Sequence, residues 1–107
     1  MKKFLIYHMV IEGLGPKVLA QREQVFEVFT DTLDSAFIAA QNVHNDGYLN
    51  LGIRDTTIGD IIQDTETNAC YMILEKGYQS VPKDVLSFID WGYKMNQFIC
   101  IKQLCNI

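Results

Sequence analysis

The chain has 107 residues, a formal net charge of −4 and a sequence pI near 4.9. This acidic balance disfavours direct binding to nucleic acid, which needs a basic surface to meet the phosphates. Hydrophobic residues make up 49% and charged residues 21%, which is typical of a folded chain and not of a disordered one. We expect a single domain over residues 1–107.

The start of the chain does not resemble a secretory signal. The apolar run from Phe4 to Ile11 is short, is interrupted by His8 and is followed by Glu12. Apolar runs of about 18 residues are missing, so we expect no membrane span and a cytoplasmic protein. The three cysteines are Cys70, Cys100 and Cys105. Their wide spacing predicts neither a disulfide framework nor a metal site. We expect no cofactor.

The first third of the chain predicts two strands. Residues 4–11 are rich in β-formers and read as a central strand. Gly13 to Pro16 marks a turn. Residues 17–24 fit either a loop or a short helix. Residues 25–29 predict a second strand, antiparallel to the first.

A helix is predicted next, over residues 32–44. Thr30 to Thr32 offer N-cap side chains, and Asp34 lies in the first turn, where the helix dipole favours an acid. Apolar residues then recur at spacings of three and four: Leu33, Ala36, Phe37, Ala40 and Val43. Asn45 to Gly47 ends the helix. Residues 48–53 fit either a short strand or a loop.

The middle of the chain gives conflicting signals. Ile58, Ile61 and Ile62 have helical spacing, whereas Gly59 is a poor helix residue. The polar run 64–68 is typical of a hairpin loop, and a β-rich run follows it. We therefore predict a hairpin that pairs residues 58–63 with 69–76.

The last third predicts an edge strand, a helix and a final strand. Residues 78–81 extend the sheet edge, and Pro82 starts a helix. Its apolar face is predicted from spacing alone: Val85, Leu86, Phe88, Ile89 and Tyr93. Gly92 is expected near its end, and residues 98–104 form the last strand. The order β-β-α-β-β-α-β, open to one extra short strand, predicts an α+β fold with two helices and a mostly antiparallel sheet.

One segment has a family resemblance. Thr57-Ile58-Gly59-Asp60-Ile61-Ile62, then Tyr71, then Gly77-Tyr78 resembles a pattern in YodL-like proteins of phages and plasmids. Ala36-Phe37 and Arg54 precede it as they do in that family. The resemblance covers residues 33–82. This chain departs from the family pattern at four positions. It has Thr57 where Ser is commoner, Ile in place of Val twice, and Tyr78 where Phe is commoner. It implies a protein of phages or mobile elements and carries no agreed activity.

The residues of this motif also have a structural interpretation. Gly59 permits a backbone conformation that other residues avoid, and Thr57 and Asp60 can hydrogen-bond nearby N–H groups. The alternative is that Thr57 and Asp60 belong to a ligand or partner surface. Elsewhere His8 reads as a packed strand residue and His44 as a helix-end cation. No phosphate loop or nucleophile motif appears, so we expect no enzyme.

Negative charge is concentrated in one stretch. Residues 31–66 hold seven acids and one base, Arg54. Because turns project from a sheet, we expect an acidic rim that attracts basic surfaces. We therefore predict a non-enzymatic phage or mobile-element protein that binds and inhibits a host defence protein, such as a nucleic-acid-binding complex. The expected contact residues are Asp46, Tyr48, Asp55, Asp60, Asp64 and Glu66.

Other functions remain open at this point. A module that binds or sequesters a nucleotide would use the few bases available, Arg54, Lys76 and Lys83. A weak RNA-binding barrel is disfavoured by the acidic charge. The helix over residues 83–95, with Trp91 and Tyr93, is a candidate surface for a homodimer.

Overall fold

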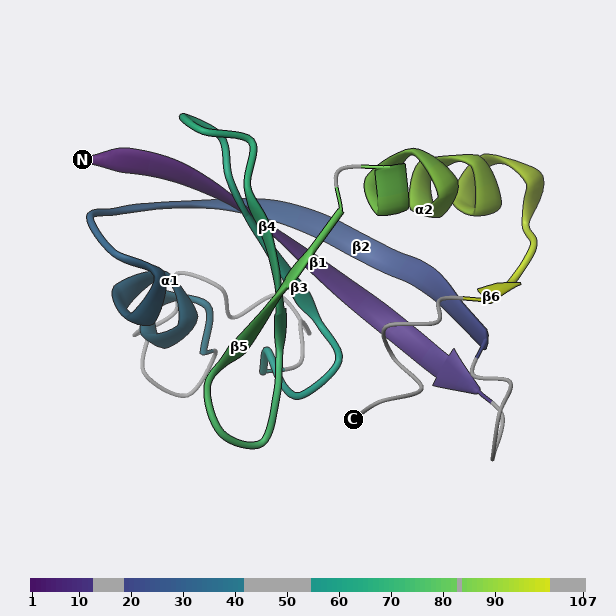
Figure 1. The fold of residues 1–107 in the computed structure, drawn as a ribbon, viewed down its shortest axis with the longest axis horizontal. Helices are drawn as coiled ribbons and strands as arrows, with labels where there is room; N and C mark the ends of the chain where they lie inside the picture. Colours follow the sequence, from purple (N-terminus) through teal and green to yellow (C-terminus); the bar gives the residue numbers. More distant parts are fainter. Residues whose placement is uncertain (13–18, 42–54, 83, 101–107) are drawn as a thin grey trace.

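In the described part of the chain, a six-stranded antiparallel sheet and two helices form the fold (Figure 1). The computed structural model describes residues 1–12, 19–41, 55–82 and 84–100. The elements are β1 (Lys2–Glu12), β2 (Leu19–Thr30), α1 (Leu33–Ala39), β3 (Ile61–Asp64), β4 (Cys70–Ile73), β5 (Tyr78–Val81), α2 (Asp84–Met95) and β6 (Ile99–Cys100). The sheet order is β5-β4-β3-β1-β2-β6. The predicted α+β class is confirmed, with β5 as the extra strand.

The two longest strands, β1 and β2, pair along their whole length. On its other side β1 also pairs with β3, from Phe4 opposite Asp64 to Tyr7 opposite Ile61. This central position explains the nearly continuous apolar run of β1, because both faces of the strand are covered. Strand β2 begins at Leu19, so the ambiguous segment 17–24 is strand wherever it is described.

The two helices cover opposite faces of the sheet (Figure 1). Neighbouring residues of a strand point to opposite faces. Ile61 accordingly packs in the cluster beneath α2, and Ile62 packs in the cluster beneath α1. In β1 the same alternation sends Tyr7 toward α2 and Ile6 toward α1. The domain therefore has two small cores, one on each side of a single sheet.

Helix α1 is shorter than predicted. Thr32 caps it through a capping box with Ser35, as the sequence indicates, but the helix ends at Ala39. The Gln41 side chain donates to the carbonyl oxygens of Phe37 and Thr56, at 3.1 and 3.0 Å. This joins the end of α1 to the segment before β3, so the chain leaves the helix here. Residues 42–44 lie outside the described part.

The predicted hairpin forms, with strands over Ile61–Asp64 and Cys70–Ile73 in place of 58–63 and 69–76. Residues 57–60 make a turn in which the Asp60 N–H donates to the Thr57 carbonyl oxygen at 3.1 Å. Gly59 has φ +93, which the third position of a type II turn requires. The conflicting periodicity thus has a physical origin, because Ile58 is at a turn tip while Ile61 and Ile62 begin β3.

Helix α2 buries only part of its apolar residues. Val85, Leu86 and Ile89 face the sheet as predicted, whereas Phe88 and Tyr93 are exposed. Gly92 is buried in the last turn of the helix, which ends at Met95. In β2, the Arg22 guanidinium pairs with Asp90 at 2.8 Å and stacks 3.9 Å from the centre of the Tyr93 ring. These contacts fix the rotation of α2 on the sheet.

The last strand is brief where it is described. β6 comprises Ile99 and Cys100 and pairs with Leu19 and Ala20 of β2. The remainder of the predicted strand 98–104 falls outside the described residues. Across the described segments, no helix is both long enough and apolar enough to cross a bilayer.

Candidate functional site

Asp60, predicted as a partner contact, lies in the interior. Only 1% of its surface is exposed. One carboxylate oxygen accepts the N–H of Met9 at 2.8 Å, and the other accepts the N–H of Thr57 at 2.9 Å. Asp60 therefore holds the turn before β3 against β1 and is out of reach of a partner. Its geometry matches the structural interpretation of the motif.

The side chains of Thr56, His8 and Asp60 lie close together. His8 Nε2 lies 2.8 Å from Thr56 Oγ1 and 4.0 Å from Asp60 Oδ2. The Thr56 hydroxyl donates to the carbonyl oxygen of Ala40 at 3.3 Å, which links the end of α1 to β1. All three side chains are buried. No substrate can reach them in this conformation, so the trio joins elements and provides no accessible reaction site.

Asp64 is paired within the protein. Its Oδ2 lies 3.1 Å from Lys2 Nζ, and its Oδ1 accepts the N–H of Glu66 at 2.9 Å. Burial by itself raises the pKa of Asp64, but Lys2 and the backbone N–H groups of Glu66 and Thr67 outweigh it and lower the pKa below 3.8. Asp64 is thus a link between β1 and the β3–β4 hairpin.

The other predicted contact residues differ in their exposure, and two of them are not described. Glu66 is exposed at the hairpin tip and Asp55 is half-buried. Asp46 and Tyr48 lie outside the described residues. Near Glu66, the N-terminal ammonium lies 3.7 Å from Asp31, and Lys2 pairs with Asp64. This end of the sheet therefore carries both signs of charge, and the described acids do not form one uninterrupted rim.

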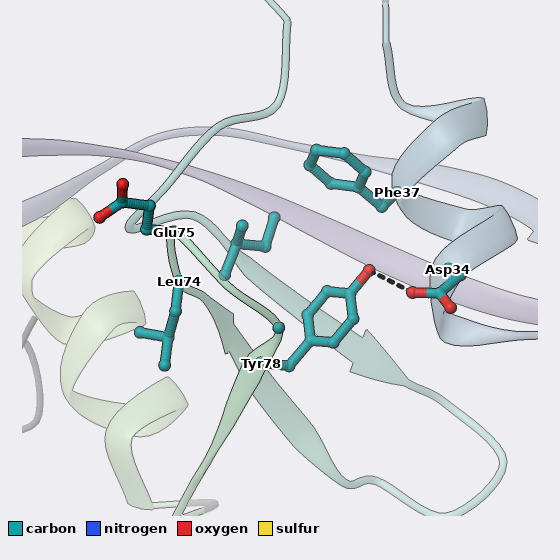
Figure 2. Close-up of a pocket in the computed structure, with 7 residues that line it drawn as sticks. Asp34, Phe37, Leu74, Glu75 and Tyr78 are labelled. Carbon is teal, nitrogen blue, oxygen red and sulfur yellow. Dashed lines mark hydrogen bonds between the residues drawn. The ribbon is translucent and has the colours of Figure 1, made fainter.

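A different group of acidic and aromatic side chains comes together beside α1. They line a groove of about 300 Å³ between this helix and the β4–β5 turn (Figure 2). Asp34 and Phe37 extend from α1, and Tyr78 from β5 points toward Asp34. The described lining residues are Asp34, Phe37, Ile73, Leu74, Glu75, Gly77 and Tyr78.

One hydrogen bond spans the groove. The Tyr78 hydroxyl donates to Asp34 Oδ1 at 2.8 Å (Figure 2). Burial, together with this hydrogen bond and the negative charge of Asp34, raises the pKa of Tyr78 to about 12. The phenol therefore stays neutral at physiological pH and donates a hydrogen bond to the Asp34 carboxylate. None of the described lining residues is basic.

Sequence reasoning did not find this groove. It assigned Asp34 to the helix dipole and Tyr78 to a sheet edge, and both assignments are compatible with the structure. The two residues are 44 positions apart and meet only because α1 packs beside the β4–β5 turn. The family-like Gly77-Tyr78 pair was the one available signal, since Gly77 has φ +84 and turns the chain just before Tyr78.

Among the described residues, neither a metal site nor a reactive cysteine site is found. Over residues 1–12, 19–41, 55–82 and 84–100, no three His, Cys, Asp or Glu side chains gather where they could hold a metal ion. Cys70 is a buried thiol in the core beneath α2. It fills space as a small hydrophobe does.

Comparisons with known proteins add no family. No protein-family model, no curated protein and no solved structure matches this chain. Function is therefore argued from the groove and the surface charges.

Proposed function

We propose that this protein acts without catalysis, by binding a basic segment of another protein in the groove between α1 and the β4–β5 turn. The observation that carries the proposal is the grouping of Asp34 with the rings of Phe37 and Tyr78 beside an apolar floor, with Glu75 in the β4–β5 turn at the edge of the groove. A lysine or arginine side chain fits such a lining. Its charge meets the carboxylates and its stem lies along the rings.

The sequence resemblance supplies the biological setting of this proposal. Proteins of phages and mobile elements act inside host cells, so we place the interaction in the host cytoplasm and propose that a host defence protein is the target. A defence protein that handles nucleic acid presents basic surface to it. An acidic ligand on that surface blocks it by occupying space and by competing with the phosphates.

A nucleotide is a poorer fit for the same groove. Phosphate groups are negative and are repelled by Asp34 and Glu75. Lys76 is exposed in the same turn but is not among the residues that line the groove. Arg54 and Lys83, the other bases considered for a nucleotide, lie outside the described residues. The groove therefore favours the protein-binding proposal over the nucleotide-binding one.

The test starts from a partner captured from host lysate and then purified. Its affinity is measured for the wild type and for the double variant Asp34→Asn, Glu75→Gln. Each amide keeps the size of the side chain, and at position 34 its oxygen can still accept from Tyr78. We expect binding weakened about tenfold or more, and a shallower dependence on salt, because two interfacial charges are lost.

Two control variants distinguish the loss of groove carboxylates from the loss of negative charge elsewhere on the protein. Glu12→Gln removes an exposed carboxylate from the far end of β1 and should leave affinity unchanged. Asp55→Asn with Glu66→Gln tests the acids predicted from sequence. Unchanged binding by the groove variant would reject the groove, and a loss confined to Asp55 and Glu66 would transfer the site to them. Thermal stabilisation by a nucleotide, with no protein captured, would favour the alternative module.

A further inference from the structure

Helix α2 carries a second apolar stripe on the side away from the sheet. Phe88, Trp91 and Met95 follow one another at spacings of three and four and are 62%, 53% and 57% exposed. Such spacing places the three side chains on one face of a helix. An open groove of about 320 Å³, lined by Ser87, Phe88 and Trp91, lies along it. We call Phe88, Trp91 and Met95 the α2 stripe.

The α2 stripe is held outward by the rest of the fold. Val85 and Ile89 bury a neighbouring side of the helix against the sheet. Arg22 holds the third side through Asp90 and Tyr93. Rotating the helix to bury the stripe would break these contacts, so the exposed rings are a stable feature of the surface. Contiguous exposed apolar residues of this kind mark sites of association.

Charges at the two ends of the α2 stripe are opposite. Asp84 is exposed at the N-terminal end and Lys94 is exposed at the C-terminal end. When two such helices pack antiparallel about a two-fold axis, position 84 of one meets the region of position 94 of the other. The same axis places Phe88 against Trp91 of the second copy, and Trp91 against Phe88. The stripe is thus apolar along its length and self-complementary in charge at its two ends.

From this complementarity we propose that α2 is the interface of a homodimer, packed antiparallel on α2 of a second copy. The inference is independent of the groove beside α1, which is on the other side of the sheet. The three apolar side chains expose on the order of 300 Å² per protomer, well short of the ~800 Å² of a standard interface. We therefore expect a weak and reversible dimer.

Trp91 is the single tryptophan of the chain and reports on this interface directly. Dilution of the wild type should shift its emission to longer wavelength as the dimer separates, in step with the mass measured by light scattering. Phe88→Ser should weaken association about tenfold or more. Ile38→Ser is the matched control, because Ile38 is 58% exposed on α1. It should leave the dimer unchanged.

Charge exchange tests the arrangement of the two helices. Asp84→Lys alone and Lys94→Asp alone should each weaken the dimer about tenfold, whereas the double variant should recover most of the wild-type affinity. Loss of helix-dipole stabilisation cannot explain that recovery, because both ends of α2 are then unfavourable and the double variant would be the worst.

Three outcomes would overturn the proposal. The first is a monomer across the whole concentration range. The second is a dimer indifferent to Phe88→Ser and to the charge variants. The third is Trp91 emission typical of a buried indole in a sample that light scattering shows to be monomeric, which would mean that the chain covers the stripe itself.

Discussion

At the scale of single residues, Asp60 is the side chain on which the turn before β3 depends most. Each of its carboxylate oxygens accepts a backbone N–H, one from β1 and one from within the turn. Hydrogen bonds from buried N–H groups to a carboxylate are among the stronger ones in proteins. Asp60, which the sequence motif offers as a partner contact, therefore has a structural role in this turn.

Asp60→Asn should destabilise the protein by about 2–4 kcal/mol, because the amide group can accept only one of the two N–H donors and sets its own N–H₂ against the other. Urea denaturation gives the free energy of unfolding. Ile58→Ala, at the exposed tip of the same turn, is the control and should cost under about 0.5 kcal/mol. Equal stability of Asp60→Asn and wild type would contradict the buried carboxylate network.

At the scale of elements, Gly92 lets the end of α2 and the returning chain approach closely. A Cβ at this position would lie 2.8 Å from the Gln97 carbonyl oxygen and 3.1 Å from Ile99 Cγ2. The Gln97 N–H also donates to the Gly92 carbonyl oxygen at 2.8 Å. This contact directs the chain from α2 into β6.

Gly92→Ala should therefore destabilise the protein by about 1–3 kcal/mol, although the same change in an open helix stabilises by about 1 kcal/mol. Thermal or urea denaturation measures the difference, and hydrogen exchange should show faster opening at β6. Gly77→Ala is the comparison, since no atom lies within 4 Å of its added Cβ and only its φ of +84 is strained. A gain in stability for Gly92→Ala would show that the approach is not tight.

The spacing of apolar residues predicted the elements that bury these residues in a regular pattern. β1 reads as a central strand because it is apolar on both faces, and α2 starts where Pro82 indicates. α1 was predicted too long, since its end depends on Gln41 bonding to Thr56, a contact that no local pattern encodes. Phe88 was assigned to the buried face because hydrophobicity does not distinguish a core contact from an exposed stripe.

The candidate site was less predictable than the fold. Its side chains come from α1 and from residues 73–78, which meet only after the sheet and α1 have assembled. Conversely, Asp60 and Asp64 were selected for their charge, and their burial and pairing are tertiary facts. Acidic composition predicts an acidic surface, but it does not say which carboxylates the fold leaves available.

At the scale of the whole molecule, stability should fall as pH rises from about 10 to about 12. Tyr78 has its pKa raised to about 12 in the folded state, against 10.0 in the unfolded chain. Above pH 10 the unfolded state loses the proton first, so the unfolded state is favoured until the folded state also ionises. The stabilisation is complete below pH 10 and is lost through this window.

Tyr78→Phe removes this titration and should flatten that part of the curve of unfolding free energy against pH. Asp34→Asn should lower the pKa of Tyr78, since the charge of Asp34 helps to raise it, and should narrow the same window. Tyrosinate absorbance follows the ionisation directly. A wild-type curve that is level to pH 12, or identical in Tyr78→Phe, would contradict the hydrogen bond across the groove.

The central place of β1 in the sheet has a consequence for how the chain folds. β1 is synthesised directly before β2, which can pair with it at once. Its other neighbour, β3, follows about sixty residues later, because Phe4 pairs with Asp64. Distant pairings of this kind slow folding. Until the ribosome has released β3 and β4, the emerging hairpin exposes Ile6 and Tyr7 on an open strand edge, so these two residues are expected to attract chaperones during translation.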